Sequence, residues 1–189
     1  MASADELKAL VRTIPDFPKP GIEFRDITTL LLDRVGLAGA VDALAASVTA
    51  PVDLVAGIEA RGFAIGGALA IKLGAGMLLI RKDGKLPGET ITEDYALEYG
   101  TDRLAMHVDA VAPGARVLVV DDLADSGHTL NVIKDELPKR YPHLTDVKTA
   151  VIWKKGVSMF NPDFFVEFLP NSPWIHQPFE NYDSTRPHQ

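Results

Sequence analysis

Residues 119–129 read VVDDLADSGHT, and this stretch decides the fold expected for the whole chain. Residues 116–120 before it are rich in β-branched valine and predict a buried strand, and residues 129–141 predict a helix after it. Short apolar runs that also predict strands alternate with helical patterns elsewhere: 52–57, 77–80, 147–153 and 164–168. This order predicts an α/β fold with a mostly parallel central sheet flanked by helices, and its ligand site should lie at the carboxyl ends of the strands.

The other segments are expected to be peripheral. Apolar spacing predicts helices over 5–14, 35–48 and 62–73, and short strands over 22–25 and 103–108. Residues 82–99 show no sustained period and contain glycine and proline breaks, so we expect a long mobile loop there, a kind of loop that usually serves a function. Residues 170–189 are expected to form a tail or surface flap, within a single domain over 1–189.

Composition excludes several classes of protein. The 189 residues include no cysteine, which rules out disulfides and a cysteine nucleophile. We expect a cytoplasmic protein without membrane contact, because no apolar run reaches the ~18 residues of a membrane span and the N-terminus has no signal-peptide pattern. The formal net charge of −7 argues against nucleic-acid binding, which needs a basic face, but is compatible with a small anionic ligand.

The first candidate site follows the strand over 117–120. Asp121 and Asp122 end the apolar run, where their carboxylates can accept hydrogen bonds from sugar hydroxyls or reach a magnesium shell. A non-functional alternative is that both carboxylates are only solvated, beside a helix N-cap formed by Asp125 or Ser126. We expect that N-cap in either case. We favour a ligand because two carboxylates at a buried strand end are costly without a partner. Small and polar residues then open a helix whose first amides can bind phosphate: Ser126, Gly127, His128 and Thr129.

Two further loops follow buried strands. Arg61 lies in a glycine-bounded turn and could clamp an anionic oxygen, although an exposed Glu59–Arg61 ion pair would explain the same residues. Three cations within five positions, Arg81, Lys82 and Lys85, suit a polyphosphate, although solvated basic turns are common. Together the loops suit a phosphorylated sugar that carries a second, leaving anion. The usual glycine motifs for nucleoside triphosphates and dinucleotides are absent from the sequence.

These residues resemble the purine phosphoribosyltransferase family. Residues 119–129 are similar to its phosphoribosyl-diphosphate motif, and the N-terminal two-thirds of the chain resemble its adenine branch. The C-terminal stretches 162–166 and 174–180 resemble the xanthine-guanine branch instead. The resemblance to the adenine branch rests on four stretches in order: 17–28, 57–63, 81–88 and 95–100.

The resemblance implies a type I phosphoribosyltransferase fold, with a small hood formed by about residues 1–30 and the C-terminal tail. It implies purine salvage, in which a purine nitrogen attacks C1 of 5-phosphoribosyl 1-diphosphate, Mg²⁺ assists and diphosphate leaves. Adenine, giving AMP, is the favoured base. A 6-oxopurine (hypoxanthine, guanine or xanthine) is the alternative, and a regulator that senses purines or phosphoribosyl diphosphate is the second alternative. Because relatives are commonly dimers, a homodimer is expected.

The resemblance also implies roles for the donor-binding residues. Asp121 and Asp122 would face the ribose hydroxyls and hold Mg²⁺, directly or through water, while residues 126–129 would bind the 5-phosphate. Glu98 and Tyr99 would close over the site and exclude water. A non-proline cis peptide is expected between residues 59 and 60. The diphosphate would meet the basic side chains of two loops: Arg61, Arg81, Lys82 and Lys85.

Two residues are candidates for handling the proton. Asp125 stands where adenine-type enzymes usually carry alanine, and an aspartate there resembles the 6-oxopurine enzymes. Asp125 is therefore the first candidate general base, and Glu98 is the adenine-type candidate. His128 also departs from the adenine pattern, which has glycine at this position. Its amide can still bind phosphate.

The purine contacts are expected from three parts of the chain. Phe24 and Arg25 come from the N-terminal segment. Trp174, followed by Ile175, would stack on the base, which is worth about 1–3 kcal/mol; the alternative is that Trp174 only anchors the tail. One of two lysines at the end of a strand would donate to a 6-oxo group, which adenine lacks: Lys154 or Lys155.

Overall fold

A computed structural model describes residues 4–16, 20, 23–97 and 100–170. The described residues up to Ala40 form one compact unit, and Val41–Pro170 form another. The expected single domain and hood stay predictions.

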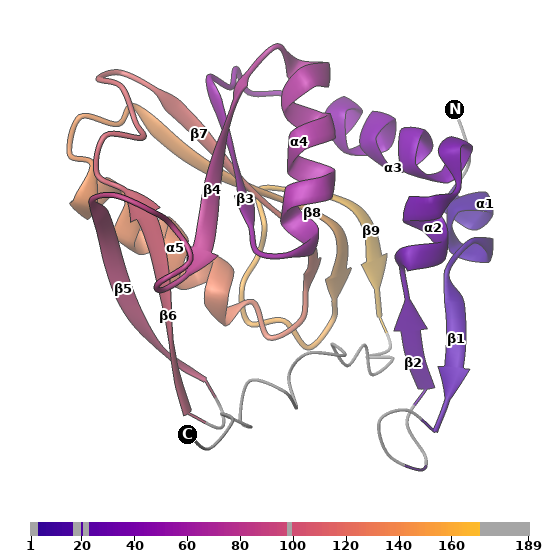
Figure 1. Cartoon of the computed structure of the whole chain (residues 1–189). Coiled ribbons are helices and arrows are strands. Elements are labelled where there is room, and N and C mark those ends of the chain that lie inside the picture. The colour runs from indigo at the N-terminus through magenta and orange to yellow at the C-terminus, as the bar shows by residue number, and fades with distance from the viewer. Residues whose placement is uncertain (1–3, 17–19, 21–22, 98–99, 171–189) are drawn as a thin grey trace. The chain divides into compact units, whose positions relative to one another are not determined.

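No helix among the described residues has the length and hydrophobicity to cross a membrane. The elements are, in chain order (Figure 1), α1 Ala4–Ala9, β1 Arg12–Pro15, β2 Glu23–Asp26, α2 Thr28–Leu32, α3 Arg34–Ser47, β3 Leu54–Ile58, α4 Arg61–Leu73, β4 Gly76–Lys82, β5 Thr90–Leu97, β6 Gly100–His107, β7 Arg116–Ala124, α5 His128–Arg140, β8 Asp146–Lys155 and β9 Phe164–Leu169.

The larger unit is built on a seven-stranded sheet with the order β5-β6-β4-β3-β7-β8-β9. The five strands β4, β3, β7, β8 and β9 run parallel to one another. At one edge, β6 pairs antiparallel with β4, and β5 pairs antiparallel with β6. The expected α/β fold with a mostly parallel sheet is therefore confirmed.

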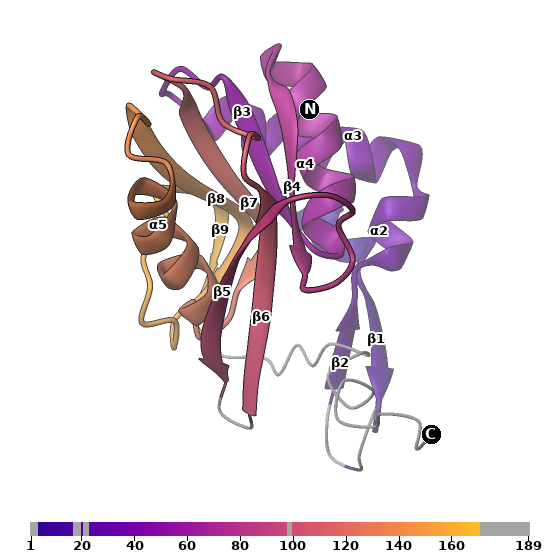
Figure 2. The same cartoon turned by 60° about the vertical axis from the view of Figure 1, so that its left-hand side comes forward.

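Helices α4 and α5 cover opposite faces of this sheet (Figure 2). Helix α4 connects β3 to β4, and α5 connects β7 to β8, so the two connections lead outward from the middle of the sheet in opposite directions. Since parallel crossovers are almost always right-handed, opposite directions place the helices on opposite faces. The direction changes between β3 and β7, and ligands of open α/β sheets bind beyond the strand ends at such a point.

The core of this unit includes one face of α5 and the strand that precedes it. Leu130, Ile133 and Leu137 recur at helical spacing and are buried with Val119 of β7 in one apolar cluster. Burial of each such side chain contributes roughly 1.5–3 kcal/mol. The end of β7 and the start of α5 are thereby held firmly, which positions the loop between them.

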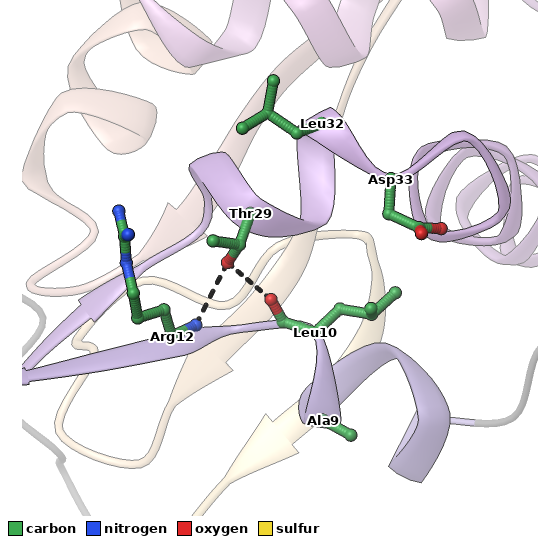
Figure 3. A pocket seen from close by; sticks show the side chains of 6 residues that line it. All are labelled: Ala9, Leu10, Arg12, Thr29, Leu32 and Asp33. Carbon is green, nitrogen blue, oxygen red and sulfur yellow. Dashed lines mark hydrogen bonds between the residues drawn. The ribbon is translucent and has the colours of Figure 1, made fainter.

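The smaller unit contains an antiparallel pair, β1 and β2, in which Arg12 lies opposite Asp26. The Arg12 guanidinium pairs with the Asp26 carboxylate, which also accepts a 2.9 Å bond from the Thr28 amide. The Thr29 hydroxyl donates to the Leu10 carbonyl at 2.5 Å and accepts from the Arg12 amide at 3.2 Å (Figure 3). An open hollow of about 470 Å³ lies beside these bonds and is lined by Ala9, Leu10, Arg12, Thr29, Leu32 and Asp33.

The expected helix over 5–14 is wrong in its second half. Helix α1 ends at Ala9, and Arg12–Pro15 form β1. Ile14 precedes a proline, which disfavours the helical conformation, and this β-branched residue also suits a strand. Pairing with β2 then supplies the hydrogen bonds that a helix would have supplied. Helix α2 at Thr28–Leu32 was not predicted.

The expected loop over 82–99 is also wrong for much of its length. Residues Thr90–Leu97 form β5, which pairs with β6 over its whole length. Residues that favour strands, such as Ile91 and Thr92, form too short a pattern in this segment to predict a strand without knowledge of its partner. The strand expected over 116–120 is longer than predicted as well, because β7 continues to Ala124.

Candidate functional site

The predicted donor-binding loops follow strands that are neighbours in the sheet. Arg61 opens α4 directly after β3, Arg81 and Lys82 end β4, and Asp125 follows β7. These strands are parallel, so their carboxyl ends lie at the same edge of the sheet. The structure therefore brings the three loops together at the point where the connections change direction.

Glycines allow a close approach between the β3 loop and β7. A Cβ atom on Gly62 would lie 2.6 Å from the Val120 carbonyl oxygen, and one on Gly57 would lie 2.5 Å from the Gly62 carbonyl oxygen. Larger residues would push the start of α4 away from β7. The peptide bond between Glu59 and Ala60 in this loop is cis, which confirms the expectation.

Arg61 bridges from this loop to the carboxylates of β7. Its Nη1 atom lies 3.4 Å from Oδ2 of Asp122, a residue only 1% exposed. The alternative of an exposed Glu59–Arg61 pair is not what the structure shows, because the Glu59 carboxylate bonds to other cations. Asp121 and Asp122 lie inside β7 instead of after it.

The pKa of Asp121 is raised well above its usual range, by burial first and by the neighbouring Asp122 charge second. The Arg61 guanidinium, which pairs with Asp122, also lowers the pKa of Asp121, but not enough to offset these two causes. An arriving cation would stabilise the ionised form of Asp121 and lower its pKa.

The basic residues of the β4 loop gather around Glu59. Its carboxylate accepts hydrogen bonds from Lys85 Nζ at 2.8 Å, the Lys82 amide at 2.9 Å and Arg81 Nε at 3.3 Å. Arg81 Nη1 also donates to the Lys85 carbonyl at 3.0 Å. Sequence reasoning missed this role of Glu59, although the parallel pairing of Ile58 with Ile80 places Glu59 beside Arg81.

The predicted phosphate loop joins β7 to α5. Gly127 is the N-cap residue, has φ +79°, and makes no side-chain cap bond, so neither Asp125 nor Ser126 occupies the N-cap position. The Ser126 hydroxyl instead accepts from the His128 amide at 3.3 Å, and Thr129 lies in the first turn of α5. The left-handed conformation at Gly127 turns the chain sharply from strand to helix.

A segment after β8 supports this loop from outside, which sequence reasoning did not foresee. The Met159 amide donates to the Ser126 carbonyl at 3.1 Å. A Cβ atom on Gly127 would lie 2.4 Å from Cβ of Phe160 and 2.6 Å from Oγ of Ser158. The phosphate loop is therefore held by residues 158–160 as well as by its own helix.

The two candidate lysines have different partners. Lys155 is buried and donates a 2.7 Å hydrogen bond to Oδ2 of Asp125. Lys154 bonds to the Asn161 side chain, and its ammonium lies 5.8 Å and 5.6 Å from the ring centroids of Phe165 and Phe168. Successive side chains of a strand point to opposite faces, so β8 brings only Lys155 to the phosphate loop.

The remaining predicted purine and closure residues are not tested by this geometry. Phe24 and Arg25 lie in β2, in the smaller unit. Four residues lie outside the described part of the chain, and their roles stay predictions: Glu98, Tyr99, Trp174 and Ile175.

Comparison with known proteins identifies the family. A family profile described as "Phosphoribosyl transferase domain" matches residues 31–184. The chain belongs to the phosphoribosyltransferase family. It is therefore an enzyme of phosphoribosyl transfer, as its sequence predicts.

Individual relatives are similar over most of their length. An adenine phosphoribosyltransferase from Methylobacillus flagellatus is 57% identical over 124 residues, which are 65% of this chain and 70% of the relative. The crystal structure of adenine phosphoribosyltransferase from Rhodothermus marinus superposes with a TM-score of 0.75 at 39% identity, over 87% of this chain and 97% of that one. The enzyme from Saccharomyces cerevisiae, complexed with adenine and an imino-altritol bisphosphate, gives 0.70 at 31% identity, over 80% and 88%.

Proposed function

We propose that this phosphoribosyltransferase acts in purine salvage. It transfers the 5-phosphoribosyl group of phosphoribosyl diphosphate to adenine, giving AMP and diphosphate. One observation carries the proposal: a phosphate loop, two carboxylates and a cluster of basic residues meet at one sheet edge of a chain that is 57% identical, over 124 residues, to an adenine phosphoribosyltransferase.

The α5 end of the site binds the 5-phosphate in this proposal. The first amides of α5 point out of the helix without intrahelical acceptors, and the helix dipole favours an anion there. Ser126 and Thr129 would add hydroxyl donors and Gly127 a backbone amide, and the His128 amide would exchange its bond to the Ser126 hydroxyl for one to the phosphate. The Met159 bond to the Ser126 carbonyl and the close packing of Ser158 and Phe160 against Gly127 keep these donors in place before the phosphate arrives.

The chemistry at C1 is electrostatic. The ribose gains positive charge as diphosphate departs, and the carboxylates of Asp121 and Asp122 would face its hydroxyls and offset that charge. The side chains of Arg61, Arg81, Lys82 and Lys85 face the departing diphosphate. Closure by Glu98 and Tyr99 would exclude water, which would otherwise hydrolyse the donor.

The carboxylates also fit the Mg²⁺ that the family implies. Among the described residues, no group of three or more His, Cys, Asp or Glu side chains gathers into a metal site. Mg²⁺ is usually held by one or two carboxylates together with substrate phosphates, and Asp121 with Asp122 supplies such oxygens. When bound, the ion would neutralise charge on the diphosphate.

The proton of the purine is taken by Asp125 or Glu98. Asp125 bonds to Lys155 through Oδ2, so its Oδ1 remains for an N–H group of the base. The Asp125–Lys155 pair also favours the second candidate, a 6-oxopurine substrate, because a carboxylate and an ammonium together match a ring N–H beside a carbonyl oxygen. Phe24, Arg25, Trp174 and Ile175 complete the proposed purine contacts. A cytoplasmic homodimer belongs to the same proposal.

Separate assays with each base test this function. The purified protein is incubated with phosphoribosyl diphosphate, Mg²⁺ and adenine, hypoxanthine, guanine or xanthine, and the nucleotides are separated by chromatography. AMP and diphosphate should appear in equal amounts, and chelation of Mg²⁺ should stop both. No nucleotide from any base would contradict the proposal, and salt-sensitive DNA binding without turnover would favour a regulator.

A further inference from the structure

Glu59 joins the two loops that are proposed to meet the diphosphate. It follows β3, and its amide donates to the Ile80 carbonyl of β4 at 2.9 Å. Its carboxylate then reaches across to the β4 loop, with Oε1 on Lys85 Nζ and Oε2 on both Arg81 Nε and the Lys82 amide. One side chain therefore fixes two cations and the backbone between them.

The burial of these groups shows which partner orders the others. The Glu59 side chain is 12% exposed, whereas those of Arg81 and Lys85 are 31% and 49% exposed. Burial alone would raise the pKa of Glu59, but the bonds from Lys85, Lys82 and Arg81 outweigh it and hold that pKa below its usual value. A largely buried, charged carboxylate thus lies beneath two cations that face solvent.

The carboxylate orders these cations without using all their donors. An ammonium has three N–H donors, and Glu59 accepts one from Lys85. The Arg81 bonds to Glu59 and to the Lys85 carbonyl use Nε and Nη1, so neither engages Nη2. Without Glu59, the like charges of Arg81 and Lys85 would repel each other and their long side chains would sample many rotamers.

We propose that Glu59 is a positioning residue for the diphosphate of the donor: it holds Arg81 and Lys85 in one arrangement before the diphosphate binds. Preformed donors lose little entropy on binding, so this arrangement strengthens diphosphate binding although Glu59 is itself an anion. The inference rests on the proposed function, because it takes diphosphate as the leaving group.

The test replaces Glu59 by glutamine, which keeps the shape but removes the charge, with Glu59→Asp as a shorter carboxylate. Asp53→Asn is the matched control. Asp53 precedes β3 and likewise accepts a backbone amide and a guanidinium, both from Arg116, at 2.8 Å and 2.7 Å. The measurements are Tm, kcat, KM for each substrate, and the Kd of inorganic diphosphate with Mg²⁺ by calorimetry.

For Glu59→Gln we expect KM for phosphoribosyl diphosphate and Kd for diphosphate to rise about tenfold, as loss of charge-assisted bonds implies, with KM for adenine unchanged. Glu59→Asp should fall between Glu59→Gln and wild type. Asp53→Asn should lower Tm alone. Unchanged or tighter diphosphate binding in folded Glu59→Gln, or an equal rise in both KM values, would overturn the inference. Wild-type protein without turnover of adenine would overturn the proposed function instead, and diphosphate calorimetry would still test Glu59.

Discussion

The ammonium of Lys155 lies 2.7 Å from the carboxylate of Asp125 and links the end of β8 to the loop between β7 and α5. The two partners differ in environment, since the Lys155 side chain is 2% exposed and that of Asp125 is 50% exposed. Removal of one partner should therefore have a different effect from removal of the other.

The fold should tolerate Lys155→Met better than Asp125→Ala. The alanine variant leaves a buried ammonium without its carboxylate, which should cost about 2 kcal/mol or more of unfolding free energy. The methionine variant leaves a half-exposed carboxylate that water can solvate. Urea denaturation of both variants checks this order, and a larger loss for Lys155→Met would show that the pair does not stabilise the fold in this way.

Asp125→Asn tests the proton-handling role. The amide keeps the size and one acceptor oxygen but cannot act as a base, so kcat should fall about 10²–10⁴-fold while KM for phosphoribosyl diphosphate changes little. Steady-state kinetics with adenine provide the measurement. If kcat stays at the wild-type value, Asp125 has no part in proton transfer and Glu98 becomes the remaining candidate.

Gly127→Ala should disable the phosphate loop. Its Cβ would meet Phe160 at 2.4 Å, and its φ of +79° is unfavourable for alanine by about 1–2 kcal/mol. Gly114→Ala is the matched control, because its φ is +81° but its nearest neighbour, Oγ1 of Thr145, is 4.0 Å away.

Both glycine variants should have a lower Tm than the wild type, because alanine is unfavourable at a positive φ. Only Gly127→Ala should also raise KM for phosphoribosyl diphosphate, by at least about tenfold if one phosphate bond is lost. Equal kinetics for the two variants would mean that residues 158–160 do not position the loop.

Asp163 follows the segment 158–160 and bonds to Lys134 of α5 and Thr149 of β8, which predicts a pH dependence. Burial alone would raise the pKa of Asp163, but bonds from Lys134 and Thr149 hold it below its usual value. Between the two pKa values the folded protein binds fewer protons than the unfolded chain, so the ionised carboxylate stabilises the fold above about pH 4. That contribution is lost as the pH falls through the lowered value.

Asp163→Asn should therefore lower the free energy of unfolding by about 1–2 kcal/mol at pH 7, with the difference shrinking below about pH 4. Urea denaturation at pH 7 and at pH 3 makes the comparison. A difference that grows on acidification would contradict this reading of the Lys134–Asp163–Thr149 network.

Local patterns were enough to predict the centre of the fold. The apolar run of β7 and the spacing of Leu130, Ile133 and Leu137 in α5 each depend on residues close in sequence. Strands that exist only through a distant partner were missed. Arg12–Pro15 became a strand because it pairs with residues 23–26, and Thr90–Leu97 because it pairs with β6.

The site was predicted less completely for a related reason. Whether Lys154 or Lys155 reaches the phosphate loop depends on which face of the sheet each position of β8 points to. An error of one residue along the strand reverses the answer. The role of Glu59 depends on the register between β3 and β4, in which Ile58 lies opposite Ile80. Composition and spacing determine neither the orientation of the β8 side chains nor the register between β3 and β4. The types of residue at the strand ends, in contrast, were sufficient to indicate a phosphorylated sugar.

The most direct test of the proposed activity is a competition between bases. Wild-type protein receives Mg²⁺, limiting phosphoribosyl diphosphate and equal concentrations of adenine and hypoxanthine, and AMP and IMP are quantified at early times. The ratio equals the ratio of the two kcat/KM values, so it is independent of enzyme concentration. We expect AMP to exceed IMP by at least about tenfold, the ratio that a binding difference of 1.4 kcal/mol produces. An excess of IMP would contradict adenine as the substrate and favour a 6-oxopurine enzyme built on the Asp125–Lys155 pair.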